Sequence, residues 1–63
     1  MKIHKSITLE KVIDATKKTE YLGYCISCGH EAQGVESDAQ NYECEDCGAL
    51  QVFGAEELLT MLV

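Results

Sequence analysis

The sequence predicts a small metal-stapled α+β fold, in which two short helices flank a short antiparallel sheet. Three observations lead to this prediction. The chain has only 63 residues, and so small a core usually needs a staple. Four cysteines stand in two C-x2-C-G frames, the spacing of a tetrahedral thiolate metal site. Apolar residues at helical spacing lie on either side of these frames. We therefore expect one domain over residues 1–63.

The first helix is expected over residues 8–18. Its predicted buried stripe follows i, i+3, i+4 and i+7 spacing: Leu9, Val12, Ile13 and Thr16. Thr8 is a candidate N-cap. Lys17 and Lys18 lie in the last turn, where the helix macrodipole favours cations.

Residues 20–53 are predicted to form the sheet and both cysteine turns. Short strands are expected over 21–24 and 31–35 around the first cysteine pair, and over 41–43 and 50–53 around the second. Residues 36–41 form a polar turn between them. Gly54 ends the last strand and is a candidate N-cap for a helix over 55–62. The apolar positions of that helix are Ala55, Leu58, Leu59 and Leu62.

The candidate metal ligands are Cys25, Cys28, Cys44 and Cys47. Two intervening residues let one tight turn present both sulfurs of a pair to the same ion. Gly29 and Gly48, which follow the two pairs, can take the positive φ that turns the chain back and aims N–H groups at sulfur. The chain starts without an apolar signal segment, so we expect a cytoplasmic protein, whose thiols stay reduced. In such a compartment, four paired cysteines indicate a metal site rather than disulfides.

The two frames, Cys25-x-x-Cys28-Gly29 and Tyr42-x-Cys44-x-x-Cys47-Gly48, resemble the knuckles of the zinc-ribbon, or rubredoxin-knuckle, group. The segments 34–39, 42–44 and 53–59 are also similar to small uncharacterised zinc-ribbon proteins of bacteria and their phages. The first resemblance implies a ribbon over about residues 21–54 that holds one structural Zn²⁺, with Fe as the less favoured metal. Neither resemblance implies an activity, because ribbons serve many partners.

Charge is distributed unevenly along the chain. Residues 1–18 hold all five lysines and two acids, a charge of +3, whereas residues 19–63 hold nine acids and no lysine or arginine, a charge of −9. This balance argues against nucleic acid, whose phosphates need clustered cations. It favours a partner protein with a basic surface. A homodimer through the C-terminal apolar helix is a further expectation, and no apolar run is long enough for a membrane.

Two alternatives stay open at this point. One is a rubredoxin-like iron electron carrier, because iron and zinc compete for the same sulfurs. The other is a nucleic-acid-binding ribbon that uses the N-terminal lysines. We do not expect an enzyme, since four thiolates leave a metal no open position. His30 is expected to be a surface or supporting residue, and His4 to lie in a frayed terminus without a role.

Overall fold

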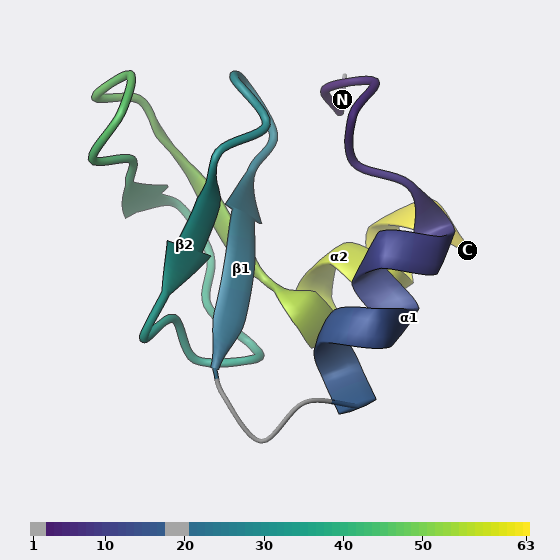
Figure 1. Ribbon diagram of the computed structural model, residues 1–63. Helices are drawn as coiled ribbons and strands as arrows, with labels where there is room; N and C mark the ends of the chain where they lie inside the picture. The colour runs from purple at the N-terminus through teal and green to yellow at the C-terminus, as the bar shows by residue number, and fades with distance from the viewer. Residues whose placement is uncertain (1–2, 18–20) are drawn as a thin grey trace.

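A computed structural model describes residues 3–17 and 21–63. Within these residues, six elements follow one another: α1 (Leu9–Lys17), β1 (Leu22–Cys25), β2 (Glu31–Gln33), β3 (Tyr42–Glu43), β4 (Leu50–Gly54) and α2 (Ala55–Leu62). The strands form one antiparallel sheet in the order β2-β1-β4-β3. Both helices lie on the same side of this sheet (Figure 1). The α+β arrangement predicted from the sequence is confirmed.

Side chains on both faces of the two central strands, β1 and β4, are buried. Along β1, Leu22 and Tyr24 point toward the helices, while Cys25 belongs to a second cluster on the other face. The register continues this alternation into β4, because Tyr24 pairs with Phe53 and Cys25 with Val52. Side chains of paired residues in antiparallel strands share a face. The sheet therefore separates the helical layer from the cysteines.

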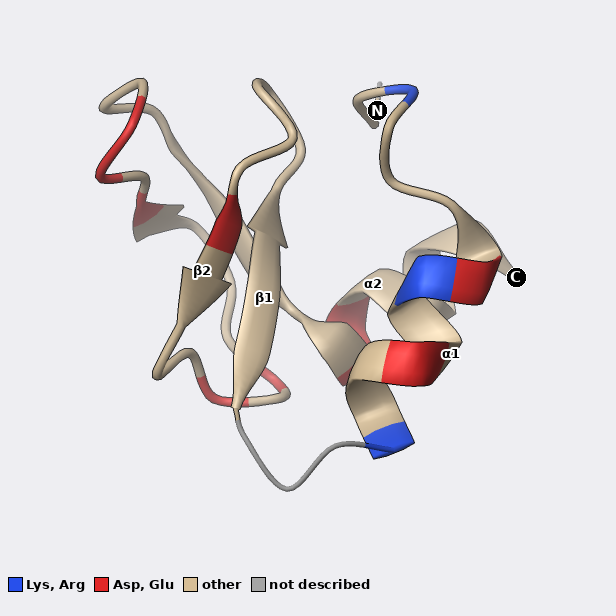
Figure 2. Ribbon diagram, in the orientation of Figure 1, with Lys and Arg blue, Asp and Glu red and all other residues tan. Residues whose placement is uncertain are grey.

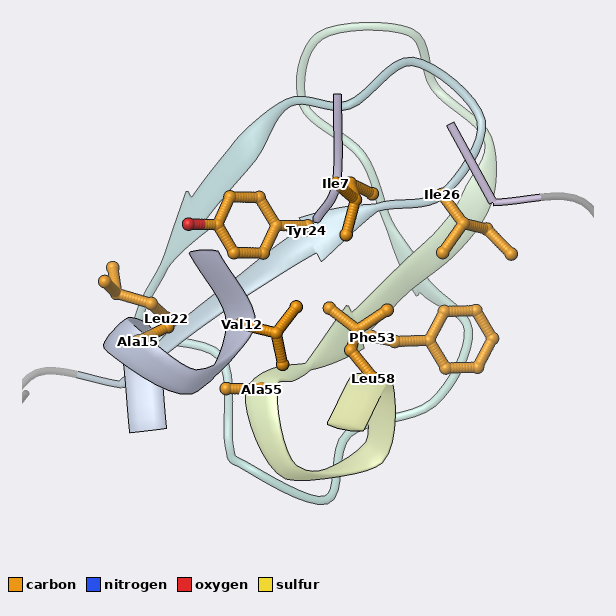
Figure 3. Close-up of a cluster of buried hydrophobic side chains, with 9 residues drawn as sticks. All are labelled: Ile7, Val12, Ala15, Leu22, Tyr24, Ile26, Phe53, Ala55 and Leu58. Atoms are coloured by element: carbon orange, nitrogen blue, oxygen red, sulfur yellow. The ribbon is translucent and has the colours of Figure 1, made fainter. Parts of the chain in front are cut away.

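The main core lies between the helices and the sheet (Figure 3). Leu58 from α2 and Val12 from α1 are fully buried at its centre. Its buried members come from the segment before α1, both helices, both central strands and the turn after β1: Ile7, Val12, Ala15, Leu22, Tyr24, Ile26, Phe53, Ala55 and Leu58. Nine buried side chains make a small core, as the chain length predicts.

Helix α1 begins as expected but buries a different face. Thr8 caps it, since the Lys11 N–H donates to Thr8 Oγ1 at 3.2 Å. The predicted buried stripe is correct only at Val12: Val12 and Ala15 are buried, whereas Leu9 and Ile13 remain 42% and 37% exposed. Ala15 and Val12 lie one turn apart on the face that joins the main core, so Leu9 and Ile13 lie toward solvent. Predicted residues 18 and 20 lie outside the described residues.

Glycines set two of the strand ends. Strand β2 stops at Gln33 because Gly34 has a φ of +74°, which is a turn conformation and not a strand conformation. The expected strand over 31–35 is therefore too long. Gly54, in contrast, has an extended φ of −69°, ends β4 and is the N-cap of α2. A side chain there would collide with the main chain of Glu36 and Ser37.

The segment before α1 is ordered against the first cysteine turn, contrary to the expectation of a frayed terminus. The His4 N–H donates to the Ile26 carbonyl at 2.8 Å, and the Ile7 N–H donates back to the His4 carbonyl at 3.0 Å. Ile7 is buried in the main core, and Ile3 packs against it. Apolar burial on both sides of His4 fixes this segment, which local polarity alone does not reveal.

Candidate metal centre

The sheet brings the two cysteine turns together at one end of the molecule. The first turn, or first knuckle (residues 25–29), connects β1 to β2, and the second knuckle (residues 44–48) connects β3 to β4. Because β1 and β4 are antiparallel neighbours, the end of β1 lies beside the start of β4. Both knuckles therefore meet at this end, opposite the loop that joins β2 to β3 (Figure 1).

The four sulfurs lie at distances that suit one ion. Cys25 Sγ is 3.7 Å from Cys47 Sγ, and Cys28 Sγ is 3.6 Å from Cys44 Sγ. All four sulfurs lie within 4.8 Å of one another. A tetrahedral ion with sulfurs at ~2.3 Å has S–S edges of about 3.8 Å. The cysteines are thus positioned to coordinate one metal ion.

The two knuckles share one backbone pattern. The Gly29 N–H donates to the Cys25 carbonyl at 2.7 Å, and the Gly48 N–H donates to the Cys44 carbonyl at 2.9 Å. Gly29 and Gly48 have φ values of +84° and +78°, as predicted from their place after each pair. In each knuckle the main-chain N–H of the first cysteine also donates to the carbonyl of the residue after the glycine. The Cys25 N–H donates to the His30 carbonyl, and the Cys44 N–H donates to the Ala49 carbonyl.

Backbone N–H groups in the second knuckle stabilise negative charge on sulfur. The N–H groups of Asp46 and Cys47 donate to Cys44 Sγ at 3.4 and 3.5 Å. Chiefly through the Cys47 N–H, they lower the pKa of the Cys44 thiol to about 7, against the opposing effect of burial. Such donors offset part of the charge that four thiolates place around one ion.

The pKa of the Cys28 thiol is shifted in the opposite direction. The backbone N–H of His30 lowers its pKa, but burial and the hydrogen bonds with the other three sulfurs outweigh that effect and raise it to about 12. Four neighbouring thiols cannot all ionise without a cation between them, so one retains its proton. A divalent ion at the centre removes this conflict.

Exposure differs among the four candidate ligands. Cys25 and Cys44 are buried, Cys28 is half-buried and Cys47 is exposed. Val35 and Val52 belong to the same buried cluster as Cys25 and Cys44. An ion held here is therefore packed against the protein on one side and reached from solvent at Cys47. None of the four forms a disulfide.

Among residues 3–17 and 21–63, this is the one group of three or more His, Cys, Asp or Glu side chains placed to share an ion. His30 is half-buried and supports the first knuckle through its main chain. The acidic side chains at the tip of the second knuckle, Glu45 and Asp46, are exposed. The N-terminal segment was the part of the site that sequence reasoning missed. Its apolar residues Ile3 and Ile7 were the available signal.

No protein-family model matches this chain, and no curated protein or solved structure is significantly similar to it. The resemblance to zinc ribbons therefore stays a prediction from the knuckle motifs. The convergence of the four sulfurs does not depend on that resemblance. In the part of the chain that the structure describes, neither helix is long and apolar enough to cross a bilayer.

Proposed function

We propose that the chain is a zinc-ribbon interaction module whose single Zn²⁺, held by Cys25, Cys28, Cys44 and Cys47, is structural. The observation that carries this proposal is the closed set of four sulfurs at tetrahedral spacing. Four protein ligands leave zinc no open position for water or substrate, so the role is structural and not catalytic. We also propose a cytoplasmic setting, where these thiols stay reduced.

A structural ion has a large effect on a protein of this size. Zinc binding by small tetrahedral peptides contributes roughly 10–16 kcal/mol of apparent free energy at neutral pH. A core this small supplies at most about 5 kcal/mol. The ion links the two knuckles and so ties β1 to both halves of the β3–β4 hairpin. Its binding energy therefore decides whether the sheet persists.

The surface around the second knuckle supports a basic partner. Three exposed acids surround it: Glu43, Glu45 and Asp46 (Figure 2). Tyr42 and Leu50, which flank the knuckle on β3 and β4, are 42% and 60% exposed. Exposed apolar side chains with acidic neighbours are complementary to a partner surface on which Lys or Arg residues surround an apolar patch. The opposite charge also attracts such a partner at long range.

Capture from lysate at two salt concentrations tests the proposed partner. The bait is the metal-loaded chain, beside a variant with Glu43→Gln, Glu45→Gln and Asp46→Asn. The wild type is expected to capture a basic protein at low salt and to lose it at high salt, whereas the triple variant captures none. A matched control with Glu36→Gln and Asp38→Asn, at the opposite end of the sheet, should behave like the wild type.

Two outcomes contradict this proposal. Capture that is unchanged in the triple variant removes the second knuckle from the interface. Capture that disappears on nuclease treatment instead supports a nucleic-acid-binding ribbon. We expect neither, because the described lysines, Lys5, Lys11 and Lys17, form no cluster on the acidic surface (Figure 2).

An iron electron carrier is the second candidate, and the environment of the sulfurs favours it over a catalytic metal. N–H donors on Cys44 Sγ tune the potential of an iron tetrathiolate, and exposed Cys47 offers an electron path to solvent. Elemental analysis and a visible spectrum of purified protein separate the metals. A colourless protein with one zinc per chain supports the structural proposal, and a red protein with one iron supports the carrier.

A further inference from the structure

The four candidate ligands differ in how easily a small molecule in solution reaches them. Cys47 is exposed, whereas Cys28 is half-buried and Cys25 and Cys44 are buried. Held by a divalent ion, the Cys47 sulfur is a thiolate, which is the form of cysteine that reacts with oxidants. Because thiolate character and exposure decide which cysteine is oxidised first, an oxidant that approaches this site should react at Cys47.

The charge around Cys47 selects the kind of oxidant. Glu43, Glu45 and Asp46, just before it in the chain, are exposed, and residues 19–63 include no lysine or arginine. Such a surface repels anionic oxidants, for example glutathione disulfide. Hydrogen peroxide is small and neutral, so these carboxylates do not hinder its approach.

Cys25 of the first knuckle is placed to complete the reaction. Its sulfur lies 3.7 Å from that of Cys47, so a disulfide bond of about 2.05 Å needs only a small side-chain movement. Cys44 is a poorer partner, because its sulfur accepts the N–H groups of Asp46 and Cys47, and such hydrogen bonds lower the nucleophilicity of a thiolate. The sulfur of Cys44 also lies 3.6 Å from that of Cys28, which leaves these two as the second pair.

We propose that Cys47 is an oxidation site for hydrogen peroxide, and that Cys25 then forms a disulfide with it across the two knuckles. In the first step the Cys47 sulfur attacks a peroxide oxygen, the O–O bond breaks, a sulfenic acid forms and hydroxide leaves. In the second step the Cys25 sulfur attacks the Cys47 sulfur, the S–O bond breaks and a second hydroxide leaves. The two thiolates together lose the two electrons that the peroxide gains.

This reaction removes two of the four ligands at once. Cys28 and Cys44 alone cannot complete a tetrahedral site, so the ion is released and the interaction module loses its staple. The disulfide keeps the two knuckles joined until a thiol reductant restores both thiolates, so the switch is reversible. The inference rests on the proposed zinc site and adds its regulation, and it does not depend on the basic partner.

Mapping of the first disulfide tests this assignment. The full chain, reduced and loaded with zinc, is treated with substoichiometric hydrogen peroxide while an indicator dye follows zinc release. N-ethylmaleimide then labels the free thiols under denaturing conditions, and tandem mass spectrometry locates the labels. Chains with a single disulfide should carry their labels on Cys28 and Cys44, with about one zinc released for each disulfide. Reductant and added zinc should return the sample to its starting state.

Two comparisons show whether the folded site directs the reaction. With excess chelator, cysteines close in sequence should pair first, so disulfides within each knuckle should dominate. With glutathione disulfide as the oxidant, a variant with Glu43→Gln, Glu45→Gln and Asp46→Asn should release zinc about threefold or more faster than the wild type, whereas both should respond equally to peroxide. The matched control with Glu36→Gln and Asp38→Asn should behave like the wild type.

Several results would overturn the proposal. A first disulfide that lacks Cys47, or that joins Cys47 to Cys44, removes the assigned pair. Oxidation that leaves zinc bound, or the same pairing with and without the ion, removes the link to the metal site. Equal release by glutathione disulfide from the wild type and the triple variant overturns the selection of a neutral oxidant. A purified chain that binds no zinc is a different failure, because it contradicts the proposed function and this inference with it.

Discussion

The four cysteines differ in protonation because their surroundings differ. Cys44 accepts two backbone N–H groups, and its pKa is lowered to about 7. The pKa values of Cys28 and Cys47 are raised instead, that of Cys28 to about 12. The Ala49 N–H lowers the pKa of Cys47, but partial desolvation of its sulfur and the hydrogen bonds with Cys25 and Cys44 outweigh that effect. Without a cation, both are protonated in neutral solution, so metal must displace their protons.

Zinc affinity should therefore rise steeply with pH. The raised pKa values of Cys28 and Cys47 mean that binding releases at least two protons between pH 6 and 8, so the apparent association constant should increase about 100-fold or more per pH unit. An unfolded metal-free chain, whose thiols titrate near ~8.5, gives a slope at least as steep. Competition with a calibrated chelator measures this slope.

The matched control for this measurement is His30→Ala. His30 lies beside the first knuckle and supports it through its main chain, so its side chain should not alter the slope. A slope below about tenfold per pH unit would mean that one proton or fewer is released. That result would contradict binding by four sulfurs.

At the scale of elements, the N-terminal segment packs against the first knuckle. His4 Nδ1 and Ser6 Oγ lie 2.8 Å apart, and a side chain built at Gly29 would collide with Ser6 Oγ and lie 2.9 Å from His4 Nδ1. Gly48 has nearly the same φ but no atom within 4 Å of such a side chain. The two knuckles thus share one conformation and differ in what covers them.

This difference predicts unequal effects of two alanine substitutions. Gly48→Ala should lower the free energy of unfolding by about 1–2 kcal/mol, because alanine at positive φ is strained. Gly29→Ala carries the same strain and also displaces His4 and Ser6, so we expect at least ~1 kcal/mol more. Urea unfolding in excess zinc measures both losses. Equal losses, with unchanged hydrogen exchange at the His4 amide, would contradict the packing of the N-terminal segment.

The sequence was most informative where a residue type has one conformational or chemical use. The knuckle glycines were predicted with positive φ, and Thr8 as the cap of α1. Both follow from local rules, and both are confirmed. The buried face of α1 was predicted correctly at Val12 but wrongly at Leu9 and Ile13, because these two continue the same helical spacing as Val12. Only the position of α2 and β1 against Ala15 decides which side faces inward.

At the scale of the whole molecule, the sheet separates two unequal interiors. The helices cover the main core on one face, and the cysteines with a few small apolar residues fill the other. The spacing of the cysteines predicted that four sulfurs would converge. It did not reveal that the segment over residues 3–7 adds to the main core and covers the first knuckle, because that depends on contacts distant in sequence.

The two faces also depend on each other. Strand β1 contributes Tyr24 to the main core and Cys25 to the sulfur cluster, so loss of order at the knuckles removes support from the helices. We therefore expect metal binding and folding to be one cooperative event, without a stable metal-free fold.

Urea unfolding of the reduced chain, followed by far-ultraviolet circular dichroism with one equivalent of zinc or with excess chelator, tests this coupling most directly. The zinc-loaded sample should unfold in a single cooperative transition, and the chelated sample should show none. If the chelated sample unfolded with the same midpoint and slope as the zinc-loaded sample, this result would contradict the conclusion that one ion, held by four sulfurs, keeps this protein folded.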